Sequence, residues 1–535
     1  MGVHKAAEMT DLFLVNMSIG PVQGFIAAGR RTSDLFVGSR LLSLITSAAA
    51  QAFPPSPATN KFGVGLIVPH TVTSHGANKI LGIVEDPSAV TRDAETRARK
   101  QLAEAWEQAL STWSASQRSH IDLTRAESQI DNYLEFYSAW VPVNEATYSE
   151  QRDQVERLLA GRKALRDFPQ TLQDDAGIFN SPLDPSRSSV VTGKNERRVS
   201  STLQDAVHLR ESETLDGMSL LKRLLSTAYL TDLTSVNPAG NHVLSSRELA
   251  QRSRQSGFWD TTPGDDGNQD TWSPDYSYFA VLVADGDRVG TMLSNRSVGQ
   301  HRAIADKLDA FAAAARTLVA DHHGQPIYAG GDDVMALLPV SDALECAHDL
   351  AKEFTRYVSG GSLSVGVALC HYQEPLSHAV PDARTCLAQA KEIRNAVCVG
   401  VYPRSGEPIQ VRQQWSPGSS GQTWSALPFE EGLDQWVHHA TDGHVSRSTV
   451  FALWDLVRSW PSGQFDFLRR EMIRVYRHSE PGIALETQTI TANDIPEFES
   501  AEEARQFVDA LAVARFISGV DGYRHDPGQQ RGERP

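Results

Sequence analysis

The sequence predicts an α+β protein, and three observations lead to this fold class. Short apolar runs bounded by glycine, proline and aspartate alternate with longer segments in which apolar residues recur every three or four positions. Over residues 276–402 these patterns follow the order βαββαβ, with one further helix and strand. That order is typical of a ferredoxin-like domain, in which helices cover one face of an antiparallel sheet. The length of 535 residues leaves room for about three to four domains of ordinary size.

The first part of the chain predicts one α/β domain, at residues 10–165. We expect strands at 11–18, 63–70 and 133–143 and a long solvated helix at 91–118. Pro21 follows the first strand and suits the first turn of a helix, where its missing N–H leaves no bond unmade. Residues 166–270 mix loop and helical patterns and end in a stretch rich in glycine, proline and aspartate. They predict an intervening helical or loop domain with a linker.

The clearest patterns lie in the next domain, at residues 275–410. A buried strand ends at Asp285, and residues 325–340 predict two short strands around a Gly-Gly-Asp-Asp turn. Helices are expected at 304–318, 344–358 and 382–393, and further strands at 362–372 and 395–402. Residues 403–423 predict a linker, 420–520 a C-terminal helical domain whose tryptophans pack its core rather than stack on bases, and 521–535 a disordered tail.

Composition and charge narrow the class of protein. Lysine and arginine number 50 against 66 aspartates and glutamates, for a net charge of −16. This argues against a broad basic surface for nucleic acid but leaves contacts inside a larger assembly open. The four cysteines form no CxxC pair, which disfavours a disulfide scaffold and a four-cysteine zinc site. No apolar run approaches the ~20 residues that span a bilayer, and the N-terminus lacks a signal-peptide core. We therefore expect a cytoplasmic protein without membrane contact.

Three carboxylates carry the clearest chemistry. Asp285 ends one strand, and Asp332 and Asp333 lie in the turn between two others, so a ferredoxin-like sheet makes them neighbours. Such carboxylates repel each other unless a divalent cation joins them, and Mg²⁺ prefers oxygen ligands. Two ions, Mg²⁺ or Mn²⁺, can activate a hydroxyl and stabilise the leaving oxygen of a phosphoryl displacement. The alternative is an acidic hairpin turn without catalytic function, since glycine and aspartate are common in turns.

Glycines beside these carboxylates extend the candidate site toward a nucleotide. Gly330 and Gly331 permit positive φ in the turn and let a phosphate approach the backbone. Gly286 does the same beside the end of the first strand.

Three charged residues nearby each have two interpretations. Asp287 holds a metal or a base, or it caps the segment that follows. Lys391 and Arg394 fall near a helix–strand junction, where they pair with a triphosphate or form a solvated helix end.

Several blocks of the sequence resemble the large subunit of type III CRISPR–Cas effector complexes, in its Cmr-type form. They include SIGPVQGFIAAGRRTSDLFVGSRLLS at 18–43, LLAGRKALRDF at 158–168 and SPLDPSRSSVV at 181–191. The similarity is strongest in YFAVLVADGDRVGTML, YAGGDDVMALLPVSDALECA and AKEIRNAVCVGVYPRSG. Bacterial cyclic-dinucleotide synthases share a similar glycine-acidic turn but not the opening block.

This resemblance implies two ferredoxin-like palm domains, with an intervening domain between them and a helical domain at the C-terminus. It implies a nucleotidyltransferase that makes cyclic oligoadenylates from ATP when its complex binds target RNA. Asp285, Asp332 and Asp333 are then the metal-binding, catalytic carboxylates. The implied partners are a guide RNA, the target RNA and the other effector subunits, including the one that holds the 5′ tag of the guide.

The sequence departs from the fullest pattern of this family in two places. Many members start with an HD nuclease domain, whereas here the first palm begins near residue 11, so no HD-type nuclease activity is expected. Many also carry a zinc-binding cysteine cluster between the palms, but NSPLDPSRSS has no cysteine, so no zinc is expected.

The first palm differs from the second at the end of its first strand. No Asp or Glu occurs from Leu12 to Arg31, so this strand end is not expected to supply a metal carboxylate, and the first palm is expected to be non-catalytic. Gly20 instead opens a helix, whose free N–H groups suit a phosphate of a second ATP. The alternative is that Gly20 only shapes a tight turn.

Two other functions compete with nucleotide synthesis. A non-catalytic scaffold subunit would keep the palm only to hold the complex together, and the three intact aspartates argue against it. A stand-alone diguanylate cyclase would prefer GTP to ATP.

Overall fold

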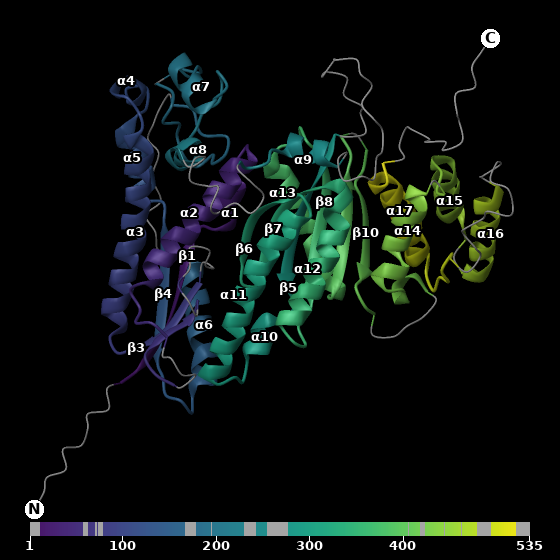
Figure 1. Ribbon diagram of the computed structural model, residues 1–535, viewed down its shortest axis with the longest axis horizontal. Coiled ribbons are helices and arrows are strands. Elements are labelled where there is room, and N and C mark those ends of the chain that lie inside the picture. The colour runs from purple at the N-terminus through teal and green to yellow at the C-terminus, as the bar shows by residue number, and fades with distance from the viewer. Residues whose placement is uncertain are drawn as a thin grey trace, which may run out of the picture.

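The computed structural model describes residues 11–56, 62–69, 72, 79–165, 178–193, 195–228, 242–253, 277–404, 406–417, 423–442, 444–461, 463–478 and 494–519. Figure 1 shows three parts in a row: an N-terminal part, a central sheet with its helices, and a group of C-terminal helices. The stretch rich in glycine, proline and aspartate at 256–275, which the sequence predicts as a linker, and the predicted tail at 521–535 lie outside the described residues. Among the helices described here, none combines the length and the apolarity that a membrane crossing requires.

Four antiparallel strands form the first sheet, in the order β2-β3-β1-β4. Sequence patterns do not predict β3, because Gly82 interrupts its apolar run. The ring of Phe53 packs where a Cβ of that glycine would stand. The strands are β1 Phe13–Gly20, β2 Gly65–Val68, β3 Lys79–Val84 and β4 Glu135–Pro142.

Helices cover both faces of this sheet. The core on one face includes α6, and the core on the other includes α2 and α3. The long helix expected at 91–118 begins earlier, directly after Asp86. The carboxylate of Asp86 caps the helix by accepting a hydrogen bond from the Ala89 N–H at 2.9 Å. The bounds are α1 Gln23–Ala27, α2 Thr32–Ala50, α3 Pro87–Ser111, α4 Ala115–Arg118, α5 Leu123–Asp131 and α6 Tyr148–Leu165.

The intervening segment contributes helices α7 Ser201–Val207, α8 Gly217–Ala228 and α9 Ser246–Arg252. Helix α8 is tied to α2 by a buried ion pair, in which Arg223 Nε lies 3.0 Å from Asp34 Oδ1. Arg223 Nη2 also lies 3.3 Å from Glu213 Oε1. Breaking a buried pair of this kind costs about 3–5 kcal/mol, so the contact holds the segment on the first domain.

Six strands form the second sheet, in the order β10-β9-β8-β5-β7-β6. Strands β8 and β9 are parallel, and the other neighbours are antiparallel. The edge strand β10 falls inside the predicted linker at 403–423, where polar residues alternate with Ile409 and Val411. The strands are β5 Tyr278–Gly286, β6 Gln325–Gly330, β7 Asp333–Pro339, β8 Leu363–His371, β9 Ala396–Tyr402 and β10 Ile409–Gln414.

Both faces of the second sheet are covered as well. Helices α11 and α12 pack on one face, as expected, while α13 packs on the opposite face together with the first domain. Parallel strands β8 and β9 need a crossover connection, and α13 supplies it. The bounds are α10 Val289–Leu293, α11 Val298–Asp321, α12 Ala343–Tyr357 and α13 Leu376–Ile393.

The C-terminal helices extend the core at the β10 edge of the sheet, where α17 contacts β10 (Figure 1). Trp415, Trp424 and Trp436 are buried in this core, which confirms the packing role for those three, whereas Trp454 is exposed. The bounds are α14 Leu433–Thr441, α15 Arg447–Ser459, α16 Phe465–His478 and α17 Ala501–Ile517.

Candidate active site

The end of β5 and the β6–β7 turn meet at one edge of the second sheet. The last pair of the β5–β7 ladder is Ala284 with Val334, so Asp285 and Asp333 follow it on the two strands. A Cβ built on Gly286 would lie 2.9 Å from the Cβ of Asp332. The structure therefore brings together the three aspartates that the sequence singles out.

The surroundings of this turn disfavour its negative charges. Burial raises the pKa of Asp332 to about 6, and the charge of Asp333 acts in the same direction. Loss of solvent also raises the pKa of Asp333, while Arg384 of α13 opposes that change. Lys79 of the first domain opposes the change at Asp332. The turn thus lies within electrostatic reach of the first domain, and it would gain from a bound cation.

Lys391 at the end of α13 forms an ion pair with Asp285. Its ammonium group also lies 3.5 Å from the carbonyl oxygen of Gly286. Burial and the neighbouring charge of Arg394 lower the pKa of Lys391. Arg394 itself is exposed and ends α13 with a φ of +59°. The structure thus places Lys391 at the carboxylates and Arg394 one turn farther along the chain.

Asp287 is buried and has a full set of protein partners. Its carboxylate accepts hydrogen bonds from the Ser364 hydroxyl at 2.7 Å, the Ser362 hydroxyl at 2.8 Å and the Asn395 N–H at 2.9 Å. These bonds join the end of β5 to the start of β8 and to the α13–β9 turn. Sequence reasoning missed the two serines and Asn395; the polar alternation in SLSVG was the only local signal.

The structure requires glycine at three positions of the site, for different reasons. Gly331 has a φ of +67°, a left-handed conformation that glycine adopts without strain. A Cβ on Gly330 would lie 2.5 Å from the Tyr328 hydroxyl, and one on Gly286 would lie 2.7 Å from Val289. Gly331 therefore satisfies a backbone requirement, and the other two leave room for packing.

The matching strand end in the first domain contains a carboxylate that the sequence pattern hides. Gly20 pairs with Glu135 across β1 and β4, and a Cβ on Gly20 would lie 3.4 Å from Glu135 Oε2. The helix expected at Pro21 begins at Gln23 and has only five residues. The expectation that this strand end lacks a carboxylate thus holds for β1 but not for the sheet, because cross-strand pairing brings Glu135 in.

The oxygen-rich donor set suits a hard divalent cation, which prefers carboxylate oxygens. Within the part of the chain that the structure describes, however, no three His, Cys, Asp or Glu side chains are grouped as metal ligands. Lys391 pairs with Asp285 in this arrangement. The metal-binding roles of Asp285, Asp332 and Asp333 remain a prediction.

Comparison with known proteins identifies two domains in the chain. Residues 278–398 match the family model of the Cas10/Cmr2 second palm domain, and residues 14–82 match that of the N-terminal region of the CRISPR-associated protein Cmr2. The first match contains the three aspartates and Lys391, and the second contains Gly20.

Sequence and structure searches agree with these matches. A segment of 164 residues is 34% identical to the CRISPR system Cmr subunit Cmr2 of Pyrococcus furiosus, covering 24% of this chain and 19% of that protein. A chain of the type III-B Cmr-beta complex bound to cognate target RNA matches with a TM-score of 0.63 and 13% identity, over 95% of this chain and 83% of that chain. A chain of a Csm1–Csm4 cassette in complex with pppApA matches with a TM-score of 0.50 and 14% identity, over 96% and 70%.

Proposed function

Because this chain belongs to the Cas10/Cmr2 family of type III CRISPR–Cas large subunits, we propose that it converts ATP to cyclic oligoadenylates when its effector complex binds target RNA. One observation carries the proposal: Asp285 and the Asp332–Asp333 turn meet at one sheet edge, inside the matched palm domain.

A pair of Mg²⁺ or Mn²⁺ ions would be held by Asp285, Asp332 and Asp333. When bound, the ions supply charge stabilisation for the attacking and leaving oxygens of the displacement. The raised pKa of Asp332, to about 6, supports this role, since it reflects a carboxylate whose charge has no full compensation within the protein.

The reaction joins one ATP to another. The 3′-hydroxyl oxygen of the first nucleotide forms a bond to the α-phosphorus of the second, the bond from that phosphorus to the bridging oxygen breaks, and pyrophosphate leaves. The hydroxyl proton passes to solvent. Repetition of this step and closure between the two ends give a ring.

Charged residues around the turn would position the triphosphate. Lys391 pairs with Asp285, and its ammonium group would change partner to a phosphate oxygen when a nucleotide binds. Arg394 follows three residues later in the chain. Gly331, where a Cβ would meet nothing within 4 Å, would leave the turn open to a phosphate, whereas Gly286 and Gly330 make room for Val289 and Tyr328. We assign Asp287 to holding the strand end in place rather than to metal or base binding, because three protein donors occupy its carboxylate.

The first palm would bind a second ATP across the domain interface without a catalytic centre of its own. The influence of Lys79 on Asp332 supports this arrangement, because it brings a cation of the first domain toward the catalytic turn. Glu135 beside Gly20 disfavours a phosphate at that strand end, so we place the phosphates of the second nucleotide toward Lys79, which would have to exchange its ion pair with Glu156 at 2.7 Å for a phosphate oxygen.

The proposed partners are guide RNA, target RNA and the other Cmr-type subunits, including the one that holds the guide's 5′ tag. Support comes from two relatives of similar fold, one solved with cognate target RNA and one with pppApA. A scaffold subunit without activity is the alternative, and it needs neither Lys391 nor the aspartates.

The test is to assemble the chain with its neighbouring subunits and guide RNA, and then to add target RNA, ATP and Mg²⁺ or Mn²⁺. Mass spectrometry should find cyclic oligoadenylates, and their loss is expected in an Asp332→Asn/Asp333→Asn variant. Asp455→Asn/Asp466→Asn, two exposed residues of the C-terminal helices, makes the same charge change as a control. Absence of product from the intact complex would favour a non-catalytic scaffold subunit. Formation of cyclic diguanylate from GTP would favour a diguanylate cyclase.

A further inference from the structure

A cleft lies away from the carboxylates, between the intervening segment and the second domain. It has a volume of about 790 Å³. Its walls come from the loop between α1 and α2, the segment after α7, the start of α9 and the β8–α13 turn. Helices α8 and α9, labelled in Figure 1, contribute Arg223 and Arg247 to the lining.

The cleft is basic although the chain is strongly acidic. Its lining contains five arginines against two glutamates, Glu213 and Glu374, and Asp34 pairs with one of these arginines, Arg223, so the local balance is 5 − 3 = +2. The whole chain carries a net charge of −16. A local excess of cations in such a chain predicts an anionic ligand. The arginines are Arg30, Arg31, Arg210, Arg223 and Arg247.

These arginines come from four separate segments and are held close together. Arg223 is buried and forms ion pairs with Asp34 and Glu213. Arg31 is exposed and donates to the His208 carbonyl oxygen at 2.6 Å. Partial burial and the charges of Arg223 and Arg210 lower the pKa of Arg31 against the opposing charges of Asp34 and Glu213, so the cations are near enough to repel one another. An anion between them would relieve that repulsion.

Two further arginines are exposed on different walls of the cleft, Arg210 after α7 and Arg247 in α9. The guanidinium of Arg247 lies 5.0 Å from the centre of the Tyr372 ring. Arginine binds phosphate through paired N–H groups, and an arginine over an aromatic ring provides a surface on which a base can stack. The cleft thus offers phosphate donors on both sides and one stacking platform.

We propose that this cleft binds a short segment of single-stranded RNA through its phosphates. Donors on opposite walls fit a chain of phosphates better than one compact anion. The volume is in the range that holds a drug-sized ligand and therefore a few nucleotides rather than a duplex. The proposal rests on the proposed function only in that RNA reaches this chain, and it does not depend on catalysis.

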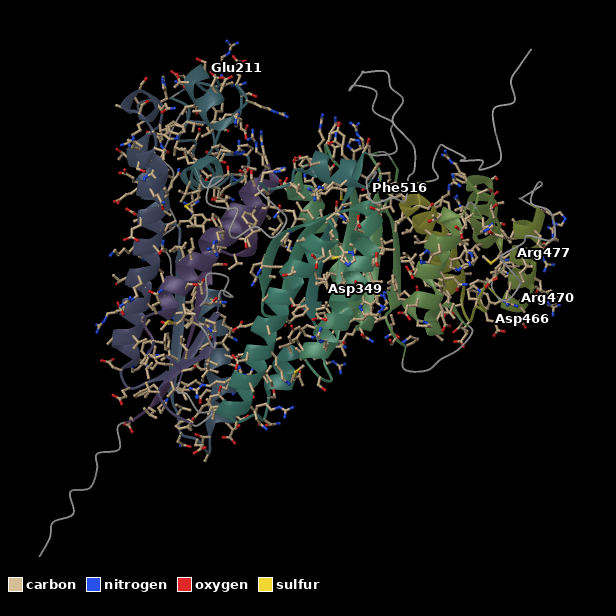
Figure 2. All side chains as sticks on the ribbon, viewed as in Figure 1. Glu211, Asp349, Asp466, Arg470, Arg477 and Phe516 are labelled. Atoms are coloured by element: carbon tan, nitrogen blue, oxygen red, sulfur yellow. The ribbon has the colours of Figure 1, made fainter. Side chains whose placement is uncertain are left out.

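Binding of a labelled, unstructured single-stranded RNA to the full chain tests this by fluorescence anisotropy over a range of salt concentrations. Arg210→Glu/Arg247→Glu is compared with Arg470→Glu/Arg477→Glu, an equal charge change on exposed residues of α16, remote from the cleft (Figure 2). We expect the cleft variant to lose at least about tenfold in affinity, since charged hydrogen bonds are removed. The slope of log K against log salt should flatten by about 1.4, or 0.7 for each of two phosphate contacts.

Equal weakening in the control variant, or no RNA binding by the intact chain, overturns the proposal. So does displacement of the RNA by ATP, pyrophosphate or an acidic peptide at matched anion concentration, since the cleft would then hold another ligand. If the charge-reversal variant Arg210→Glu/Arg247→Glu fails to fold, the test uses Arg210→Ala/Arg247→Ala instead. Thermal unfolding checks that each variant is folded. The Asp332→Asn/Asp333→Asn chain should keep its RNA affinity, which separates this test from failure of the catalytic proposal.

Discussion

Lys391 pairs its ammonium group with the carboxylate of Asp285, although α13 and β5 lie far apart in the sequence. The pair stands where metal and triphosphate are proposed to bind. Lys391 thus neutralises Asp285 in the free chain, and it would be released to a phosphate when cations take over that task.

Replacing this lysine should weaken nucleotide binding more than metal binding. With Lys391→Ala, we expect the KM for ATP to rise by about tenfold or more, because one charged hydrogen bond is worth about 1.5–3 kcal/mol. Lys391→Arg should recover part of that loss. Product formation as a function of ATP concentration measures both. A normal KM in Lys391→Ala would contradict the triphosphate role.

Stability without metal should depend on the ionisation of Asp332. Its pKa of about 6 in the folded chain is above the ordinary value of 3.8, so the folded state holds the proton more tightly than the unfolded state. Stability therefore falls as pH rises from about 4 to about 6, and the full penalty remains above that window.

Asp332→Asn should accordingly stabilise the metal-free chain at pH 7.5 by about 1–3 kcal/mol and have little effect near pH 4. Thermal unfolding with a chelator at the two pH values measures the difference. Added Mg²⁺ should stabilise the unsubstituted chain and not the variant. Equal stability of the two chains at both pH values would refute the assigned electrostatics.

Asp287 should behave as a structural residue. Asp287→Ala removes the acceptor of three hydrogen bonds, and we expect a loss of about 2–5 kcal/mol in the free energy of unfolding. Denaturant unfolding measures it, with Asp455→Ala as the comparison at an exposed position. If Asp287→Ala unfolded like the unsubstituted chain yet lost metal affinity, Asp287 would be a ligand instead.

Gly286 should tolerate no side chain. A Cβ there would meet Val289 at 2.7 Å and Asp332 and Phe354 at 2.9 Å, so Gly286→Ala should displace the catalytic turn, lower activity and destabilise the domain by about 1–3 kcal/mol. Gly290→Ala is the matched control, since a Cβ at Gly290 meets nothing within 4 Å. Unfolding curves and product yield compare the two, and equal behaviour would argue against the close packing of β5 on the turn.

Local sequence was sufficient to predict much of the second domain. The apolar run that ends at Asp285 and the Gly-Gly-Asp-Asp turn define strand ends, and the order of strands and helices makes those ends neighbours. Two strands are not predicted because their apolar pattern is weak. Gly82 interrupts the apolar run of β3, and polar residues alternate with apolar ones in β10 at Ile409–Gln414.

The sequence by itself was enough to single out the three aspartates, the glycine turn and the fold class, because strand ends, turns and the order of elements can be recognised from local patterns in the chain. Only the tertiary structure decided that Lys391 meets Asp285, that two serines and Asn395 hold Asp287, and that Glu135 stands beside Gly20. It also decided that arginines of four segments line one cleft. Such contacts arise from packing between distant elements, and neither periodicity nor spacing carries information about which side chains meet there.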